Sequence, residues 1–114
     1  TDAMSTIGSE QKEFDLFGVV VTRDKDKLTT PDGTLAGSAL DMMTAVKNAA
    51  TELALDLGEA LNMASLYPAQ YLGIDATYGS ISPGKRADLV LIDTDFKVKK
   101  TWIGGDLVFD AELG

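Results

Sequence analysis

The sequence predicts an α+β chain in which short strands come first, helices follow and strands return at the end. Three observations carry this prediction. β-Branched and aromatic residues dominate positions 14–22, which favours extended structure. After Ser38, apolar residues recur at spacings of three and four, which indicates a helix with one buried face. Near the end of the chain, Gly104-Gly105 separates two strand-like runs, which is typical of a tight hairpin.

The first part of the chain is expected to form a hairpin or a small meander. Strands are predicted at 14–17 and 19–22, with Gly18 in the turn or bulge between them. A third short strand is predicted at 28–30, before Pro31. The mixed-charge run at 23–27 is interpreted as a solvated turn, not as a binding site.

The stretch that follows is expected to be a glycine-bearing loop that leads directly into a helix. Asp32-Gly33 is a turn dipeptide, because glycine adopts positive φ without steric cost. Ser38 is the predicted N-cap and Asp41 its capping-box partner, so the helix is expected at about 38–55. Small side chains at Ala36-Gly37 would leave backbone N–H groups accessible to a ligand beside the positive end of that helix. An ordinary capped helix after a turn is the simpler interpretation of the same pattern.

Two more helices and three strands are expected in the rest of the chain. Asp56 is the predicted N-cap of a second helix, and Gly73 is expected to stop a short third one, so that helical structure covers about 57–72. Strands are predicted at 87–93, 98–103 and 106–109. Turn-capping carboxylates are expected at the two ends of the first of these strands, Asp88 and Asp93. The neighbouring Lys85 and Arg86 are interpreted as surface charge.

Composition limits the classes of function. The 114 residues suffice for one small domain with a core. A net charge of −8 argues against a nucleic-acid partner, because the phosphate backbone would be repelled. No apolar run is long enough to predict a membrane span. The sequence has no histidine and no cysteine, so its own side chains cannot build the common zinc or iron sites or a histidine-based triad.

Four motifs give the chain a resemblance to a known family. They are Thr1-Asp2-Ala3-Met4, Asp-Gly-Thr-Leu-Ala-Gly-Ser at 32–38, Met-Ala-Ser-Leu-Tyr-Pro-Ala at 63–69, and Gly-Ser-Ile-Ser-Pro-Gly-Lys-Arg-Ala-Asp-Leu at 79–89. With them, nearly the whole chain resembles the C-terminal part of the N-acetylglucosamine-6-phosphate deacetylases of the amidohydrolase superfamily. The last motif is common across that superfamily, whereas the first two in their relative spacing are more specific to the deacetylases.

The resemblance implies an α/β fold: the C-terminal fragment of a (β/α)8 TIM barrel, plus strands of a small β-sandwich domain. Residues 1–78 would be the end of the barrel, with Asp2 just after strand 8, at the face where such barrels hold their active sites. This part would include an inserted β-hairpin at about 14–30 and the helices at about 38–55 and 57–72. Residues 79–114 would be the C-terminal strands of the sandwich.

The resemblance also implies a reaction, the hydrolysis of N-acetylglucosamine 6-phosphate to glucosamine 6-phosphate and acetate. A divalent metal such as zinc or iron would polarise the amide carbonyl in the complete enzyme. Asp2 would be the catalytic residue that moves the proton, and Leu35, Ala36 and Gly37 would contact the substrate. The metal ligands and the cationic groups that hold the phosphate would lie outside this chain. We therefore expect the fragment to bind no metal through its own residues and to be inactive alone.

The expected partners are the substrate, the missing N-terminal part of the barrel and further copies of the protein. Surface evolved to pack against an absent sheet would favour a homodimer or higher association. The predicted localisation is cytoplasmic. Two alternatives stay open: another amidohydrolase acting on a different amide or cyclic amide, and a non-catalytic α+β module that binds a protein partner.

Overall fold

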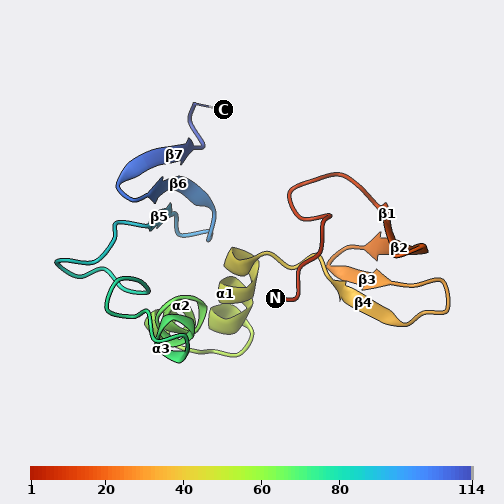
Figure 1. Cartoon of the computed structure of the whole chain (residues 1–114), viewed down its shortest axis with the longest axis horizontal. Helices are drawn as coiled ribbons and strands as arrows, with labels where there is room; N and C mark the ends of the chain where they lie inside the picture. Colours follow the sequence, from red (N-terminus) through yellow and green to blue (C-terminus); the bar gives the residue numbers. More distant parts are fainter. Residues whose placement is uncertain (114) are drawn as a thin grey trace. The chain divides into compact units, whose positions relative to one another are not determined.

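The computed structural model describes residues 1–113 and confirms that the chain, taken alone, is α+β (Figure 1). Two sheets and three helices follow one another along the sequence. Their bounds are β1 Glu13–Leu16, β2 Val19–Asp24, β3 Lys27–Thr29, β4 Leu35–Ser38, α1 Met42–Thr51, α2 Leu57–Ala64, α3 Leu66–Tyr71, β5 Leu89–Ile92, β6 Val98–Ile103 and β7 Asp106–Asp110. The chain divides into two compact units, Thr1–Ala45 and Val46–Gly114.

The first unit is built on an antiparallel meander with the strand order β1-β2-β3-β4 (Figure 1). Phe17 and Gly18 connect β1 to β2 with φ values of 53° and 86°, the left-handed backbone that tight hairpin turns require. The predicted turn at Gly18 is therefore confirmed. Val21, Leu28 and Ala39 are buried and form the core of this unit. Partly buried hydrophobic residues pack around them: Met4, Phe14, Leu16 and Ala36.

The prediction of a loop followed by a helix from Ser38 is wrong. Leu35–Ser38 is strand β4, paired with β3, and α1 begins only at Met42. The N-cap contact comes from Asp41, whose Oδ1 accepts a hydrogen bond from the Thr44 amide at 2.8 Å. That bond holds the pKa of Asp41 below its ordinary value. The backbone of Ser38 instead hydrogen-bonds to the N-terminal segment of the chain. This pairing is non-local, so the residues around Ser38 do not indicate it.

The helical region of the second unit follows the predicted order with shorter helices. α1 ends at Thr51, four residues before the expected end, and Leu53 beyond it is 70% exposed. Asp56 is confirmed as the N-cap of α2, because its Oδ1 accepts from the amides of Gly58 at 2.9 Å and Glu59 at 3.3 Å. Chain reversal after α3 uses Gly73, at a φ of 69°. None of the helices in the described part of the chain is long and apolar enough to span a membrane.

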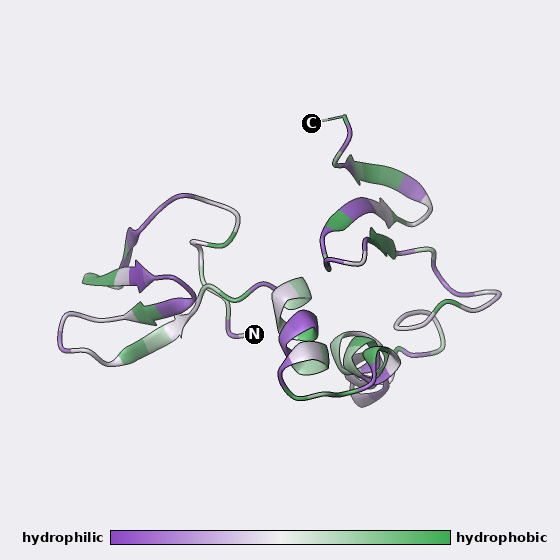
Figure 2. Cartoon of the chain, turned by 180° about the vertical axis from the view of Figure 1, so that it is seen from behind, coloured by the Kyte–Doolittle hydropathy of each residue, from purple (hydrophilic) through white to green (hydrophobic). Residues whose placement is uncertain are grey.

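The second sheet has the order β5-β6-β7, with both pairs antiparallel. Gly104 and Gly105 form the turn between β6 and β7 at φ values of 61° and 93°, as the sequence predicts. Most residues of β5 and β7 are hydrophobic, while β6 carries polar residues as well (Figure 2). Val90, Val108 and Phe109 remain about half exposed, at 56%, 55% and 48%. This sheet therefore keeps apolar surface that the described residues of the unit leave uncovered.

Candidate functional site

The predicted catalytic aspartate lies in a segment that is hydrogen-bonded alongside β4. The Ser38 amide donates to the carbonyl oxygen of Asp2 at 2.8 Å, and the Met4 amide donates to the carbonyl oxygen of Ser38 at 2.9 Å. Ala3 and Ser38 form a parallel β-bridge. Asp2 itself is exposed and has a φ of 59°, which is uncommon for a residue with a side chain. Strained backbone of this kind is more frequent at functional positions than elsewhere.

The side chain of Ser38 adds a second connection to the same segment. Its Oγ donates to the carbonyl oxygen of Thr1 at 2.6 Å and accepts from the Leu40 amide at 3.2 Å. Ser38 therefore contacts the N-terminal segment through its amide, its carbonyl and its hydroxyl. These bonds fix the backbone on either side of Asp2, although they join positions far apart in the sequence.

Gly37 lies where that segment crosses β4. Its φ of +89° is in the left-handed region, and a Cβ built there would lie 2.6 Å from Met4 Cγ and 3.1 Å from the Asp2 carbonyl oxygen. Only glycine permits this close approach. The requirement for glycine at this position is therefore already explained by packing inside the first unit, before any ligand is considered.

An open depression of about 640 Å³ lies over this crossing in the first unit. Residues from the N-terminal segment, from the β2–β3 turn and from β4 line it: Thr1, Asp2, Asp24, Lys25, Asp26, Lys27, Leu35, Gly37 and Ser38. Three acidic and two basic residues thus contribute to the lining of one space. Such a lining offers a ligand both charged residues and apolar surface.

The structure brings together only some of the site residues that the sequence predicts. Asp2, Leu35 and Gly37 line the depression, and Leu35 is 64% exposed. Ala36 lies between them in β4, but its side chain packs against the core cluster, because alternate residues of a strand face opposite sides. The prediction that these residues lie directly beside a helix N-terminus is also wrong, because α1 begins only at Met42.

The charged turn at 24–27 is the part of the lining that the sequence interpretation missed. Only Lys25 and Asp26 connect β2 to β3, with Lys25 at a φ of 54°, so the prediction of a turn over 23–27 is too long: Asp24 ends β2 and Lys27 begins β3. Pairing of β3 with β4, with Lys27 opposite Ser38, brings this connection to the depression. A bond from the Ala39 amide to the Asp26 carbonyl oxygen at 2.9 Å holds it there. No local pattern could have indicated this location.

Arg23 braces the same turn from the β2 side. Its Nε donates to the carbonyl oxygen of Lys25 at 2.8 Å, and its Nη1 donates to those of Thr6 at 3.1 Å and Ser9 at 3.2 Å. One guanidinium thereby links the loop at 6–9 to the turn that borders the depression. Thr6 is fully buried, so this link is anchored on the interior of the unit.

The donor set of the chain does not fit a metal centre of its own. Among residues 1–113, no three histidine, cysteine, aspartate or glutamate side chains are grouped closely enough to hold an ion. Carboxylates border the depression, but they come with two lysines that oppose cation binding.

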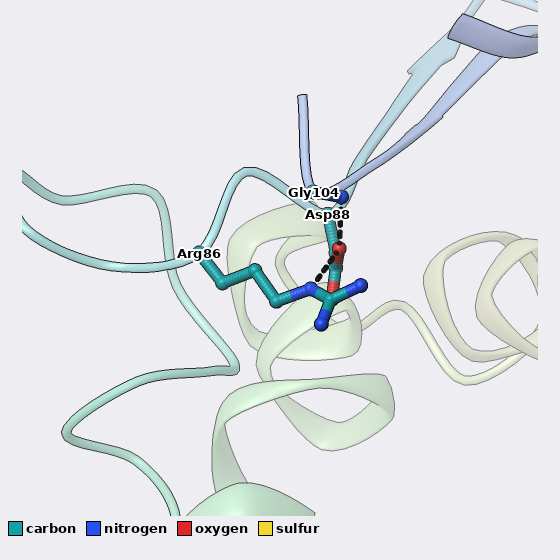
Figure 3. Close-up of polar contacts among 3 residues, drawn as sticks. All are labelled: Arg86, Asp88 and Gly104. Carbon is teal, nitrogen blue, oxygen red and sulfur yellow. Dashed lines mark hydrogen bonds and ion pairs between the residues drawn. The ribbon is translucent and has the colours of Figure 1, made fainter. Parts of the chain in front are cut away.

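The charged residues near the second sheet have structural partners. Asp88 Oδ1 accepts from Arg86 Nε at 2.8 Å and from the Gly104 amide at 2.7 Å (Figure 3). The guanidinium and then the amide hold the pKa of Asp88 below its ordinary value. Asp93 Oδ1 accepts from the amides of Asp95 and Lys97, both at 2.9 Å, which closes the turn before β6. The predicted turn-capping roles are confirmed, whereas Arg86 is an ion-pair partner and not only surface charge.

Comparison with known proteins gives matches across almost all of the chain. The chain is 46% identical over 112 residues to an N-acetylgalactosamine-6-phosphate deacetylase from Shewanella sp. (strain ANA-3), covering 98% of this chain and 28% of the relative. It is 40% identical to an N-acetylglucosamine-6-phosphate deacetylase from Vibrio furnissii, covering 97% of this chain and 28% of the relative. The chain thus spans about a quarter of the length of these relatives.

A solved structure matches the fold as well. The crystal structure of N-acetylglucosamine-6-phosphate deacetylase from Pasteurella multocida superposes with a TM-score of 0.91 at 37% identity, covering 94% of this chain and 28% of that one. The family model described as "Amidohydrolase family" matches residues 11–108. This range includes β1 to β6 and most of β7, and it contains three of the four motifs that carry the resemblance, at 32–38, 63–69 and 79–89. The chain belongs to the amidohydrolase family.

Proposed function

We propose that this chain is the C-terminal part of a hydrolase that removes the acetyl group from an N-acetylhexosamine 6-phosphate. The observation that carries the proposal is the attachment of Asp2 to Ser38 at the edge of a depression that Leu35 and Gly37 also line. Relatives named as deacetylases of such substrates support it, at 46% and 40% identity. The product would be the free amino sugar phosphate with acetate.

Asp2 is the group that we assign to proton transfer. Hydrolysis of an amide requires one group that accepts a proton when water attacks and delivers it when the amine leaves. A carboxylate can perform both steps in turn. The hydrogen bonds from Ser38 to the carbonyl oxygens of Thr1 and Asp2 would restrict the backbone that carries this carboxylate. Such restriction matters because a misplacement of about 1 Å can lower a rate by about a hundredfold.

Leu35, Ala36 and Gly37 remain our candidates for contact with the substrate, with different parts of each residue available. Leu35 offers an exposed side chain, whereas Gly37 offers only backbone beside the depression. Ala36 would have to act through its backbone, since its side chain is part of the core. Apolar side chains and a few backbone polar groups are both found in the walls of ligand pockets.

The larger architecture is part of the same proposal. Residues 1–78 would complete a (β/α)8 barrel whose other strands lie outside this chain, and residues 79–114 would join a β-sandwich. A divalent metal in the complete protein would have to be held by residues outside this chain, because the described residues do not group three suitable ligands. Uncovered apolar residues on β5 and β7 would pack against the rest of the protein or against a second copy.

The names of the relatives point to two epimeric sugars as the substrate. The relative from Shewanella is named for the galactosamine substrate and that from Vibrio for the glucosamine substrate. The test is acetate release by the complete protein from each N-acetylhexosamine 6-phosphate, with zinc, iron or manganese supplied. Release from at least one of them supports the proposal. No release from either, by a folded protein under all metal conditions, would contradict it.

A non-catalytic module is distinguished by the same assay. It predicts no turnover of any amide, with or without metal. If the protein is an amidohydrolase with another substrate, we expect turnover of a different amide or of a cyclic amide, while both sugar phosphates stay intact. A panel of these three substrate classes therefore separates the proposal from its two alternatives.

A further inference from the structure

Lys27 has a position in the depression that its sequence context does not explain. It is the first residue of β3, and its Cα partner across the sheet is Ser38. Successive residues of a strand place their side chains on opposite faces of the sheet. The next residue, Leu28, is fully buried on the other face, in the core of the unit. Lys27 is therefore exposed on the face away from the core, next to a register shift between β3 and β4, and it lines the depression together with Asp2.

The ammonium group of Lys27 is available to a ligand. The ion pairs among residues 1–113 are Arg86 with Asp88 and Lys100 with Asp110, so no described carboxylate lies within 4.0 Å of Lys27. The charged groups that share the depression are Asp2, Asp24, Asp26 and Lys25. A lysine that neither pairs with a neighbour nor packs in the core is free to contact an anion entering this space.

The charge of the chain makes such a cation useful. A net charge of −8 repels a phosphorylated sugar, and the three carboxylates at the depression add to this locally. A lysine ammonium binds phosphate oxygens as a point charge. The flexible four-carbon stem of lysine also lets the ammonium group adjust its position to a bound anion.

We propose that Lys27 is a specificity-determining residue that contacts the phosphate group of the substrate. This inference rests on the proposed function, and it adds one cation from this chain to the cationic groups expected elsewhere in the complete protein. Lys25 borders the same depression but lies in the turn, with its carbonyl oxygen held by Arg23. Lys27 lies in a paired strand directly opposite Ser38, and so it is the better placed of the two.

The test compares Lys27→Gln with Lys27→Arg in the complete protein. Lys47→Gln, on the exposed side of α1 and outside the depression, is the control for an equal change in net charge. We expect Lys27→Gln to raise KM for the sugar phosphate by roughly five- to tenfold and to change kcat by less than about twofold, the pattern of lost uniform binding. Lys27→Arg should keep most of the affinity, and Lys47→Gln should match the wild type. The KM of Lys27→Gln should also depend less steeply on salt concentration.

A second measurement separates phosphate recognition from a general effect on the site. The inhibition constants of glucosamine 6-phosphate and of glucosamine are measured for the wild type and for Lys27→Gln, with the melting temperature of each sample. The proposal predicts weaker inhibition only by the phosphorylated sugar. Equal weakening of both inhibitors, or an unchanged KM in Lys27→Gln, would overturn it. Absence of acetate release by the wild type would instead overturn the proposed function.

Discussion

The amide of Ser38 donates a hydrogen bond of 2.8 Å to the carbonyl oxygen of Asp2. This contact ties the N-terminal segment to the strand that contains the candidate substrate wall. The Ser38 hydroxyl repeats the connection one residue earlier, at the carbonyl oxygen of Thr1. A single serine thus couples the residue that we assign to proton transfer with the strand that contains Leu35 and Gly37.

Gly37 should be intolerant of any side chain. We expect Gly37→Ala to lower the free energy of unfolding of the complete protein by about 2–5 kcal/mol. The left-handed backbone contributes about 1–2 kcal/mol, and overlap of the new Cβ with Met4 and Asp2 contributes about 1–3 kcal/mol. Thermal or denaturant unfolding measures this change.

Gly33→Ala is the matched control for Gly37→Ala. Gly33 has nearly the same φ, +85°, but a Cβ there would meet nothing within 4 Å. It should therefore cost only the backbone contribution of about 1–2 kcal/mol. Equal losses in the two variants would show that close packing against Met4 and Asp2 does not explain the glycine at 37.

The N-terminus of α1 should depend on Asp41 and not on Ser38. Asp41→Ala removes the acceptor for the Thr44 amide and should cost about 1 kcal/mol of stability, the usual value for a lost N-cap. Asp41→Asn should recover most of this loss, because an amide oxygen can still accept the bond. Unfolding measurements on both variants, with helix content followed by circular dichroism, check the assignment. An unchanged stability in Asp41→Ala would show that the side chain of Asp41 does not stabilise the start of α1.

The succession of strands, helices and strands could be predicted because it depends on local patterns of residue types along the sequence. The turn at Gly18, the cap at Asp56 and the hairpin at Gly104-Gly105 each depend on neighbours in the sequence. Strand β4 could not be predicted in the same way. Its residues pair with β3 and with the segment around Asp2, and these contacts override the capping pattern of Ser38 and Asp41.

The candidate site likewise contains some residues that the sequence indicates and others that only the fold brings there. The resemblance to the deacetylases indicates Asp2, Leu35 and Gly37, and all three line one depression. Lys27 belongs to a run of alternating charges, and such a run indicates a solvated turn in most sequences, although the structure places Lys27 in β3. The location of this run follows from sheet register, which a single sequence does not specify.

Acid should weaken the second unit through Asp88. Its contacts with Arg86 and the Gly104 amide lower its pKa in the folded state below the unfolded value of about 3.9. A group with a lowered folded-state pKa stabilises the fold above the unfolded pKa, and this contribution disappears as the pH falls through the folded-state value. The melting temperature of the wild type should therefore fall more steeply than that of Asp88→Asn between about pH 5 and about pH 3.

Asp106→Asn provides the comparison for this pH dependence, because it removes one carboxylate from the same hairpin. Its melting temperature should follow the wild-type curve. Parallel curves for Asp88→Asn and the wild type over this range would show that the carboxylate does not stabilise the turn at Gly104 in the way the geometry indicates.

The most direct test of proton transfer by Asp2 is the turnover of Asp2→Asn in the complete protein. Asparagine has nearly the same shape as aspartate and leaves the backbone bonds with Ser38 in place, but it cannot accept the proton from water. We predict a kcat lowered by roughly 10²–10⁴ with KM almost unchanged, measured as acetate release on samples of equal metal content and melting temperature. A variant that retains near wild-type kcat under these conditions would show that Asp2 takes no part in the proton transfer.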